Sequence, residues 1–257
     1  MSEKVVILCG GLGTRLREET EYRPKPMVEI GGKPILWHIM KIYSHYGFND
    51  FVLCLGYRGE MIKEYFYNYQ ILNSDFTIEL GNKNVSVHSS SLEERNWKIT
   101  LVDTGKETLK GGRIKRIEKY VDSDNFMLTY GDGVADINIK ELLNFHLNHK
   151  KIGTVTGVRP PSRFGEIKVE GKKVICFTEK PQLSEGFING GFFVFRRKFF
   201  DYLTEDCDFE FGALEKLTKE GELMIYEHKG NWECMDNIRD WEHLNKLWDQ
   251  DQAFWKI

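Results

Sequence analysis

The sequence predicts an α/β fold with a mostly parallel, Rossmann-like sheet flanked by helices, a small antiparallel insert and a second, strand-rich part. Three observations support this prediction. Apolar runs of strand length alternate with segments of helical spacing along most of the chain. A glycine-rich loop directly follows the first apolar run. The chain has 257 residues and no Pro-rich linker, which favours one domain over two.

The first half of the chain supplies strands that we expect at the centre of the sheet. Lys4–Cys9 is an apolar run of strand length, typical of a parallel strand that is buried on both faces. Residues 10–23 form the glycine-rich loop. A helix should begin at Pro34, a residue favoured in the first helical position, and end at Gly47. A second buried strand at 51–55 and a helix at 60–69 follow.

Residues 71–101 differ from this pattern. Two short runs, Thr77–Leu80 and Val85–His88, alternate polar and apolar residues. Such alternation over four residues indicates small antiparallel strands, so we expect an inserted hairpin here.

The second half returns to helices and strands and becomes richer in strands after residue 160. The expected helices are 112–121, 137–149, 210–220 and 238–250, and the expected strands are 126–130, 153–158, 166–169, 174–178, 192–195 and 223–228. We therefore predict a single domain over 1–257, with a first part at about 1–150, its insert at about 70–101, and a second part at about 151–257.

Composition excludes several classes of protein. Hydrophobic residues make up 41% of the chain and the net charge is only −3, which excludes a disordered chain and disfavours a nucleic-acid partner. The sequence contains no run of eighteen apolar residues, so no membrane helix is predicted. The apolar run near the N-terminus is too short for a signal peptide. Five cysteines without a C-x-x-C pair predict neither a zinc ribbon nor a disulfide framework, so we expect the reducing cytoplasm.

The glycine-rich loop is the most informative segment. It reads Leu8-Cys9-Gly10-Gly11-Leu12-Gly13-Thr14-Arg15-Leu16. A loop of this kind at the end of a parallel strand binds phosphates through backbone N–H groups. The string fits neither the P-loop nor the dinucleotide fingerprint. Its cation Arg15, together with Lys25, suits a triphosphate, although a glycine turn with solvated cations would read the same way.

These residues carry a resemblance to a known family. The motif Gly10-Gly11-x-Gly13-Thr14-Arg15, followed by Lys25-Pro26, is similar to the signature of the sugar-1-phosphate nucleotidylyltransferases. The resemblance continues in order through nearly the whole chain, at Gly131-Asp132-Gly133, Glu179-Lys180-Pro181, Asn189-Gly190-Gly191 and Met235-Asp236. It implies that the first part of the chain binds a nucleotide and that the strand-rich second part binds a sugar phosphate.

One long segment of the sequence resembles a particular branch of this family. The segment from Lys25 to Met40 is similar to the branch of the family that uses CTP and glucose 1-phosphate. That branch transfers CMP to the sugar phosphate and releases pyrophosphate. A family member that uses UTP or another phosphate acceptor stays open as an alternative, and so does a non-catalytic nucleotide-sugar sensor. The resemblance also implies a homo-oligomer, for which the aromatic-rich insert around residues 65–97 is a possible interface.

The implied reaction requires charge neutralisation and no general base. The attacking phosphate monoester is mostly a dianion near neutral pH, because its second pKa is about 6. Cations must bring two polyanions together in line. By resemblance, Asp132 and Asp236 hold Mg²⁺, which prefers carboxylate oxygens. On local pattern alone, Asp132 could be a turn residue and Asp236 the N-cap of the next helix.

The resemblance assigns the remaining site residues. Arg15, Lys25 and Asp132 are the expected catalytic residues. The expected nucleotide-binding residues are Leu8, Gly10, Gly11, Leu12, Gly13, Thr14, Arg15, Lys25, Thr104, Arg113 and Gly131. The expected sugar-phosphate-binding residues are Gly165, Glu179, Lys180, Asn189 and Gly190. Taken alone, Glu179-Lys180 would instead be interpreted as a surface ion pair before a turn.

Overall fold

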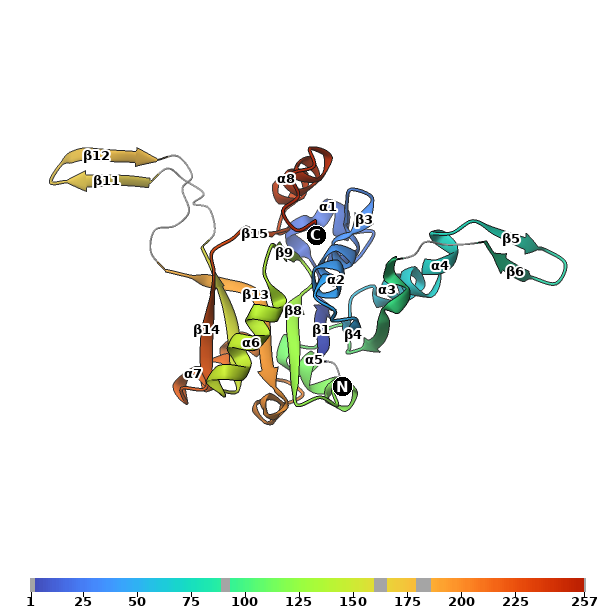
Figure 1. Ribbon diagram of the computed structural model, residues 1–257, viewed down its shortest axis with the longest axis horizontal. Helices are drawn as coiled ribbons and strands as arrows, with labels where there is room; N and C mark the ends of the chain where they lie inside the picture. The colour runs from blue at the N-terminus through green and yellow to red at the C-terminus, as the bar shows by residue number, and fades with distance from the viewer. Residues whose placement is uncertain (1–2, 89–92, 160–165, 179–185, 257) are drawn as a thin grey trace.

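A seven-stranded sheet forms the centre of the protein in the computed structural model, which describes residues 3–88, 93–159, 166–178 and 186–256 (Figure 1). The strand order is β14-β10-β13-β8-β1-β4-β7. Their bounds are β1 Lys4–Cys9, β4 Asp50–Leu55, β7 Lys98–Asp103, β8 Asn125–Tyr130, β10 Gly153–Val158, β13 Ile188–Arg196 and β14 Leu223–His228. Within this sheet β13 runs against the other strands, so the sheet is mostly parallel, as predicted.

Helices and small ladders surround this sheet. The helices are α1 Arg17–Thr20, α2 Ile35–His45, α3 Gly59–Tyr67, α4 Tyr69–Leu72, α5 Lys110–Arg116, α6 Ile139–His149, α7 Glu215–Lys219 and α8 Ile238–Asp249, with a π-helical turn at Phe209–Leu214 before α7. The two-stranded ladders are β2 Glu29–Ile30 with β3 Lys33–Pro34, β5 Phe76–Glu79 with β6 Asn84–Val87, β9 Gly133–Ala135 with β15 Trp232–Cys234, and β11 Glu166–Glu170 with β12 Lys173–Thr178. Among the described residues, no helix combines the length and apolar character needed to cross a membrane.

Two apolar cores cover the two faces of the sheet. Alternate residues of β1 face opposite sides: Val5 and Ile7 join one core, and Val6 and Leu8 join the other. Side chains from α2, α6 and α8 complete the first core, while α5, α7 and a phenylalanine cluster complete the second. This double burial explains why β1 is continuously apolar instead of alternating.

Most predicted elements are confirmed, and three details are corrected. The helix α2 begins at Ile35, so Pro34 is its N-cap instead of its first residue. The glycine-rich segment is not a loop as far as residue 23, because a 3-10 turn at Thr14–Leu16 and helix α1 lie within it. The insert ends before about residue 101: Lys98–Asp103 is β7, paired in parallel with β4 at the sheet edge. An edge strand alternates in the same way as a hairpin strand, so the pattern could not separate them.

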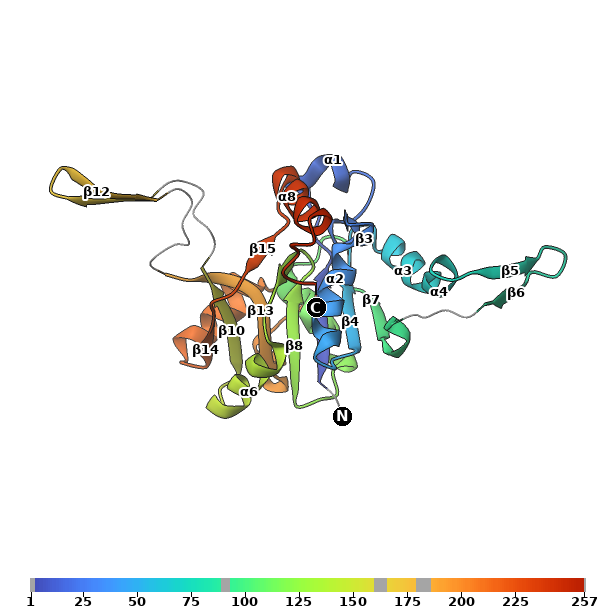
Figure 2. The ribbon, with the colours of Figure 1, turned by 45° about the horizontal axis from the view of Figure 1, so that its top comes forward.

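Two hairpins stand apart from the body of the molecule. In both views β5–β6 projects from one side and β11–β12 from the opposite side (Figures 1 and 2). The β5–β6 pair is antiparallel, with Thr77 opposite Ser86, which confirms the predicted inserted hairpin.

Candidate active site

The candidate site lies at the carboxyl edge of the parallel strands. The strands β1, β4, β7 and β8 run in parallel, so the segments that follow them meet at one edge of the sheet. A cavity of about 610 Å³ opens there. The predicted residues that line it are Leu8, Gly10, Gly11, Leu12, Gly13, Lys25, Arg113, Gly131, Asp132, Asn189 and Asp236. Its size is typical of small-molecule sites.

A lysine bridges the two predicted metal ligands. Lys25 Nζ donates to Asp132 Oδ2 at 2.7 Å and to Asp236 Oδ1 at 2.8 Å. The two aspartates are 104 residues apart in the sequence, and the short β9–β15 ladder brings them together. Directly beyond that ladder, the Met235 N–H donates to the Asp132 carbonyl at 2.9 Å. The arrangement places one ammonium group between two carboxylates.

Burial and charge act against each other in this group. Burial would lower the pKa of the Lys25 ammonium, but the charge and hydrogen bonds of Asp132 and Asp236 outweigh it and raise that pKa above the ordinary value. Partial burial would raise the pKa of the Asp236 carboxyl, yet the hydrogen bond and charge of Lys25, with Arg15 nearby, lower it. The pair Lys25–Asp236 is therefore ionised at neutral pH.

The donor set fits a divalent cation. One ligand atom from each of Asp132, Cys234 and Asp236 lies within 4.8 Å of the others. Carboxylate oxygens are the ligands that hard cations such as Mg²⁺ prefer. The Lys25 ammonium already occupies a position between both carboxylates, which shows that the pair attracts positive charge. The group thus has the ligands and the electrostatics of a metal site.

Asp236 is free for this role because its neighbour caps the following helix. Asn237 accepts from the Asp240 N–H, and Asp240 accepts from the Asn237 N–H, which forms a complete capping box for α8. The N-cap alternative for Asp236 is therefore wrong. On its outer side, Asp236 pairs with Arg15 at 3.3 Å, and the Arg15 side chain is 78% exposed. An exposed guanidinium at the rim is well placed to meet an incoming phosphate.

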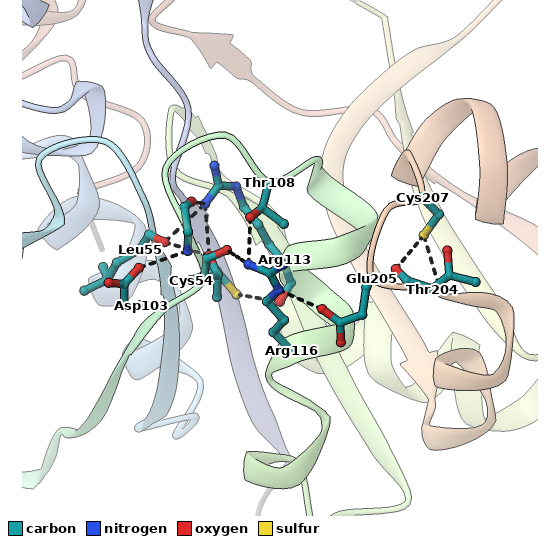
Figure 3. A network of polar contacts seen from close by, with 11 residues as sticks. Cys54, Leu55, Asp103, Thr108, Arg113, Arg116, Thr204, Glu205 and Cys207 are labelled. Atoms are coloured by element: carbon teal, nitrogen blue, oxygen red, sulfur yellow. Dashed lines mark hydrogen bonds and ion pairs between the residues drawn. The ribbon is translucent and has the colours of Figure 1, made fainter.

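Arg113 makes hydrogen bonds within the protein itself. It lines the cavity, but it is buried and its two terminal nitrogens donate to protein acceptors. Figure 3 shows the bonds made by one of these nitrogens. These acceptors are the carbonyl oxygens of Gly10, Leu55, Gly105 and Lys106 and the hydroxyl of Thr104, at 2.5 to 3.2 Å. Arg113 therefore connects the segments that follow β1, β4 and β7. Thr104 is fully buried and donates to the Leu55 carbonyl, so it also supports these segments.

The close approach of Arg113 explains one glycine of the loop. A Cβ atom on Gly10 would lie 2.3 Å from the Arg113 guanidinium. Gly13 has a positive φ of 64°, which L residues rarely adopt. Thr14, in contrast, is exposed.

A second polar network also lines the cavity. The Tyr130 hydroxyl donates to Glu210 Oε1 at 2.7 Å and accepts from Asn189 Nδ2 at 3.1 Å. Burial, then the charge of Glu210, raises the pKa of the Tyr130 phenol, so it stays a donor. The Lys110 ammonium also contacts Glu210 and lies 5.3 Å from the Tyr130 ring centre. Asn189 is thus held at the cavity wall.

The remaining predicted sugar-site residues have different outcomes. Gly190 is buried, and its carbonyl accepts from Trp232 Nε1 at 2.7 Å. Gly165, Glu179 and Lys180 lie outside the described residues.

The sequence interpretation missed several residues of the cavity. Tyr130, Lys110, Glu210 and Cys234 all line it. Tyr130 and Cys234 each lie two residues before a predicted aspartate, so proximity to those motifs was a usable signal. No sequence pattern pointed to Lys110 or Glu210, because their contact joins segments 100 residues apart.

The fold and this cavity define a class of enzyme. The chain matches the model of the nucleotidyl transferase family over residues 4–250 and therefore belongs to that family. Members of the family generally use a divalent metal, in agreement with the donor set described above. The resemblance seen in the sequence motifs is confirmed.

Individual relatives narrow this class further. The chain is 49% identical to the glucose-1-phosphate cytidylyltransferase of Salmonella typhi, over 98% of each chain. It is 46% identical to a probable glucose-1-phosphate cytidylyltransferase of Bacillus subtilis, over 99% of each chain. Among solved structures, HddC from Yersinia pseudotuberculosis matches with a TM-score of 0.70 and 25% identity, covering 96% of this chain and all of the other.

Proposed function

We propose that the protein transfers CMP from CTP to α-D-glucose 1-phosphate and releases CDP-glucose and pyrophosphate. The observation that carries this proposal is the identity of 46–49%, over almost the entire length of both chains, with relatives named for that activity. Relatives named for other nucleotides are less similar; a guanylyltransferase of Aneurinibacillus thermoaerophilus is 30% identical. The UTP-dependent and non-catalytic alternatives are therefore not favoured.

The proposed mechanism uses the cations and carboxylates of the cavity. A phosphate oxygen of glucose 1-phosphate attacks the α-phosphorus of CTP, and the bond from that phosphorus to the bridging oxygen of pyrophosphate breaks. Lys25 and Arg15 neutralise and orient the phosphates, because one is inside the cavity and the other at its rim. No side chain needs to remove a proton.

Asp132 and Asp236 would hold the divalent cation, for which we propose Mg²⁺. When bound, the cation supplies positive charge to phosphate oxygens. In the structure the Lys25 ammonium contacts both carboxylates. We infer that Lys25 moves to the phosphates when substrates and cation bind.

The base is proposed to be recognised by backbone groups. The segments 8–13 and 106–110 both line the cavity, and Arg113 fixes their carbonyl oxygens. A carbonyl that accepts from the cytosine amino group would face another acceptor in uracil. Leaving such a group unpaired costs about 1–3 kcal/mol. We therefore expect kcat/KM for CTP to exceed that for UTP by at least about tenfold.

The test is pyrophosphate release from CTP and glucose 1-phosphate with Mg²⁺. Activity should disappear in EDTA and return with Mg²⁺. The Asp132→Asn variant should fold normally and lose turnover by about 10²-fold or more, as expected for loss of a major electrostatic group. Equal use of CTP and UTP would contradict the cytidylyl assignment. Near-normal turnover of Asp132→Asn would remove this carboxylate from the mechanism.

We also propose that the protein is a cytoplasmic homo-oligomer in which β5–β6 packs against a second copy. This hairpin exposes Ile78, Leu80 and Val85 while standing apart from the body. A lone two-stranded hairpin is at best marginally stable in water. Light scattering should show an oligomer that Leu80→Glu weakens, whereas a monomeric wild type would refute the proposal. In the part of the chain that the structure describes, no disulfide joins the cysteines, in keeping with the reducing cytoplasm.

A further inference from the structure

We propose that Cys234 is a third ligand beside Asp132 and Asp236, and that the three together form a binding site for thiophilic divalent cations such as Cd²⁺ and Zn²⁺. The inference rests on the proposed function for the two carboxylates and adds a thiol to them. If the proposal holds, soft metal ions would bind at the position where the reaction needs a hard ion, and they would inhibit the enzyme.

The strand geometry directs the thiol toward the carboxylates. Cys234 ends β15 and lies opposite Gly133 in the ladder with β9. Along an extended chain, alternate side chains point to opposite sides. Met235 is fully buried in the core, whereas Cys234 and Asp236 both line the cavity. The backbone therefore places the thiol and one carboxylate on the same side, and Asp132 meets them from the neighbouring strand end.

The ligand atoms are close enough to share one ion. A sulfur and two carboxylate oxygens, one from each residue, lie within 4.8 Å of one another, so modest side-chain rotation brings all three onto a common centre. Three protein ligands leave a fourth position open toward the cavity, as in catalytic zinc sites. Cd²⁺ and Zn²⁺ favour sulfur, whereas Mg²⁺ favours oxygen and gains nothing from the thiol.

Burial and the charges of Asp132 and Asp236 raise the pKa of the Cys234 thiol, so the metal ion itself must displace the proton. On coordination the Cys234 thiol loses its proton to solvent, and the new bond joins sulfur to the metal. Three anionic ligands and a dication then leave one negative charge. Lys25, which contacts both carboxylates, and Arg15, which contacts Asp236, compensate it.

The other cysteines differ from Cys234 in burial or in neighbours: Cys176 is exposed, and among the described residues it belongs to no group of three possible metal ligands. Cys9 borders the cavity, but it is fully buried and does not belong to the three-ligand group. Cys54 is also buried. Cys207 makes local contacts with Thr204, accepting from its N–H and donating to its carbonyl, both at 3.3 Å. Cys207 is thus a suitable control for a half-buried thiol outside the cavity.

The experiment is a Cd²⁺ titration of the nucleotide-free protein, followed by the ultraviolet charge-transfer band of cadmium–thiolate bonds. Wild type should show one band with a defined endpoint. Cys234→Ser should lose this band, and its Kd for Cd²⁺ should rise at least tenfold, which corresponds to about 1.4 kcal/mol. Cys207→Ser should behave as wild type. An unchanged band and Kd in Cys234→Ser would overturn the proposal.

Two further arms identify the partners of the thiol. Asp132→Asn should weaken Cd²⁺ binding, and an unchanged affinity in that variant would overturn the three-ligand site. Cys234→Ala, checked by its melting temperature, repeats the test with a smaller side chain should the serine variant fail to fold. In pyrophosphate-release assays, half-inhibition by Cd²⁺ should need at least tenfold more metal in Cys234→Ser, relative to its own cadmium-free rate.

The failure of the proposed reaction would look different. If CTP and glucose 1-phosphate give no pyrophosphate while the band still depends on Cys234 and Asp132, the metal-binding inference is supported and the proposed reaction is wrong.

Discussion

Lys25 holds two carboxylates of like charge close together. Without its ammonium group, the carboxylates of Asp132 and Asp236 would repel each other across a partly buried space. In the folded protein the lysine offsets that repulsion at distances of 2.7 and 2.8 Å. The same position should attract any other cation that is supplied from solution.

Replacing this lysine should therefore make stability depend on metal. In Lys25→Ala we expect turnover to fall about 10²-fold or more, since the charge beside the phosphates is lost. Mg²⁺ should raise the melting temperature of Lys25→Ala at least about 2 °C more than it raises the melting temperature of wild type. A difference of that size corresponds to about 1 kcal/mol in the free energy of unfolding. Thermal unfolding with and without Mg²⁺ measures this difference.

The matched control removes a nearby cation that has other partners. Arg23 pairs with Glu19 and Glu29, away from both aspartates. Arg23→Ala should leave the response of the melting temperature to Mg²⁺ as it is in wild type. If Mg²⁺ raises the melting temperature of Lys25→Ala no more than that of wild type, Mg²⁺ does not replace the Lys25 ammonium between the two carboxylates.

At the scale of elements, Arg113 joins the chain segments at the carboxyl ends of three neighbouring strands. It extends from α5 to Gly10 after β1, to Leu55 at the end of β4 and to Gly105 after β7. Figure 3 shows the contact with Leu55. A lysine has one nitrogen and cannot reach all five acceptors. Arg113→Lys should lower the free energy of unfolding by about 1–3 kcal/mol, because buried carbonyls lose their donors. We also expect a higher KM for CTP, a smaller preference over UTP and a nearly unchanged kcat.

Steady-state kinetics and chemical denaturation measure these effects. The control is Arg116→Lys on the same helix, whose side chain is more exposed and pairs with Glu205. It should change the CTP preference much less. A purely structural role for Arg113 would instead lower stability and leave the ratio of kcat/KM values unchanged.

The start of α5 makes a second, tighter contact. A Cβ atom on Gly112 would lie 2.1 Å from the Glu205 carbonyl oxygen. Gly112→Ala must therefore push α5 away from residues 204–208, at a cost of about 1–3 kcal/mol. Because Arg113 is the next residue, the CTP preference should fall as well. Gly212→Ala, where the new methyl group would make only an ordinary van der Waals contact with Cys207 at 3.9 Å, is the control and should unfold like wild type. Equal denaturation midpoints in the two variants would contradict this packing argument.

The same elements show what could be predicted from the sequence. The strand β1 was recognisable because burial on both faces leaves a continuous apolar run, and β5–β6 because its alternation is confined to four residues per strand. The edge strand β7 was assigned to the insert, since one exposed face produces the same alternation. Short ladders have too few residues for any period, so β9–β15 was not predicted.

Knowledge of the site was limited in the same way. The residues Lys25, Asp132 and Asp236 were found through a resemblance of motifs, and their contact could not be derived from a separation of 104 residues or more. For Arg113 the motif predicted a position at the cavity but not the hydrogen bonds to backbone carbonyls. The local sequence does not distinguish an arginine that donates to backbone carbonyls from one that donates to a phosphate.

At the scale of the whole molecule, a buried histidine links distant parts of the chain. His38 on α2 contacts the Ile30 carbonyl through Nε2 at 2.9 Å, and its Nδ1 accepts from Trp255 Nε1 at 3.3 Å. The indole can only donate, so Nδ1 must carry a lone pair and the ring must be neutral. Burial lowers the pKa of His38 to about 4, although the backbone hydrogen bond opposes this change.

This neutral histidine should make the protein less stable in acid. The unfolded chain takes up the proton near pH 6.5, and the folded protein only near pH 4. Between these values the unfolded state binds more protons, so the free energy of unfolding falls as pH falls, by up to about 1.4 kcal/mol per pH unit. Buried His146, with its pKa lowered to about 3, acts in the same direction.

Chemical denaturation at pH 7 and pH 5 measures this loss. The slope should be smaller in His38→Gln, although that variant starts from lower stability at pH 7. His45→Gln, which changes an exposed residue of the same helix, should keep the slope of wild type. The observation of His38 titrating near pH 6.5 by NMR would show that the ring is not held neutral.

The bridge between Lys25 and the two aspartates also has a consequence for the order of events during protein synthesis. Ribosomes add about 5–20 residues per second, so Asp236 follows Asp132 by roughly 5 to 20 seconds. During that interval Lys25 can form its contact with Asp132 alone, and β15 is not yet present to pair with β9. The nascent chain can therefore assemble the central strands and the glycine-rich loop early, while its phosphate-handling centre stays incomplete. A ribosome-bound fragment that ends before residue 236 should for this reason have a folded sheet and no turnover.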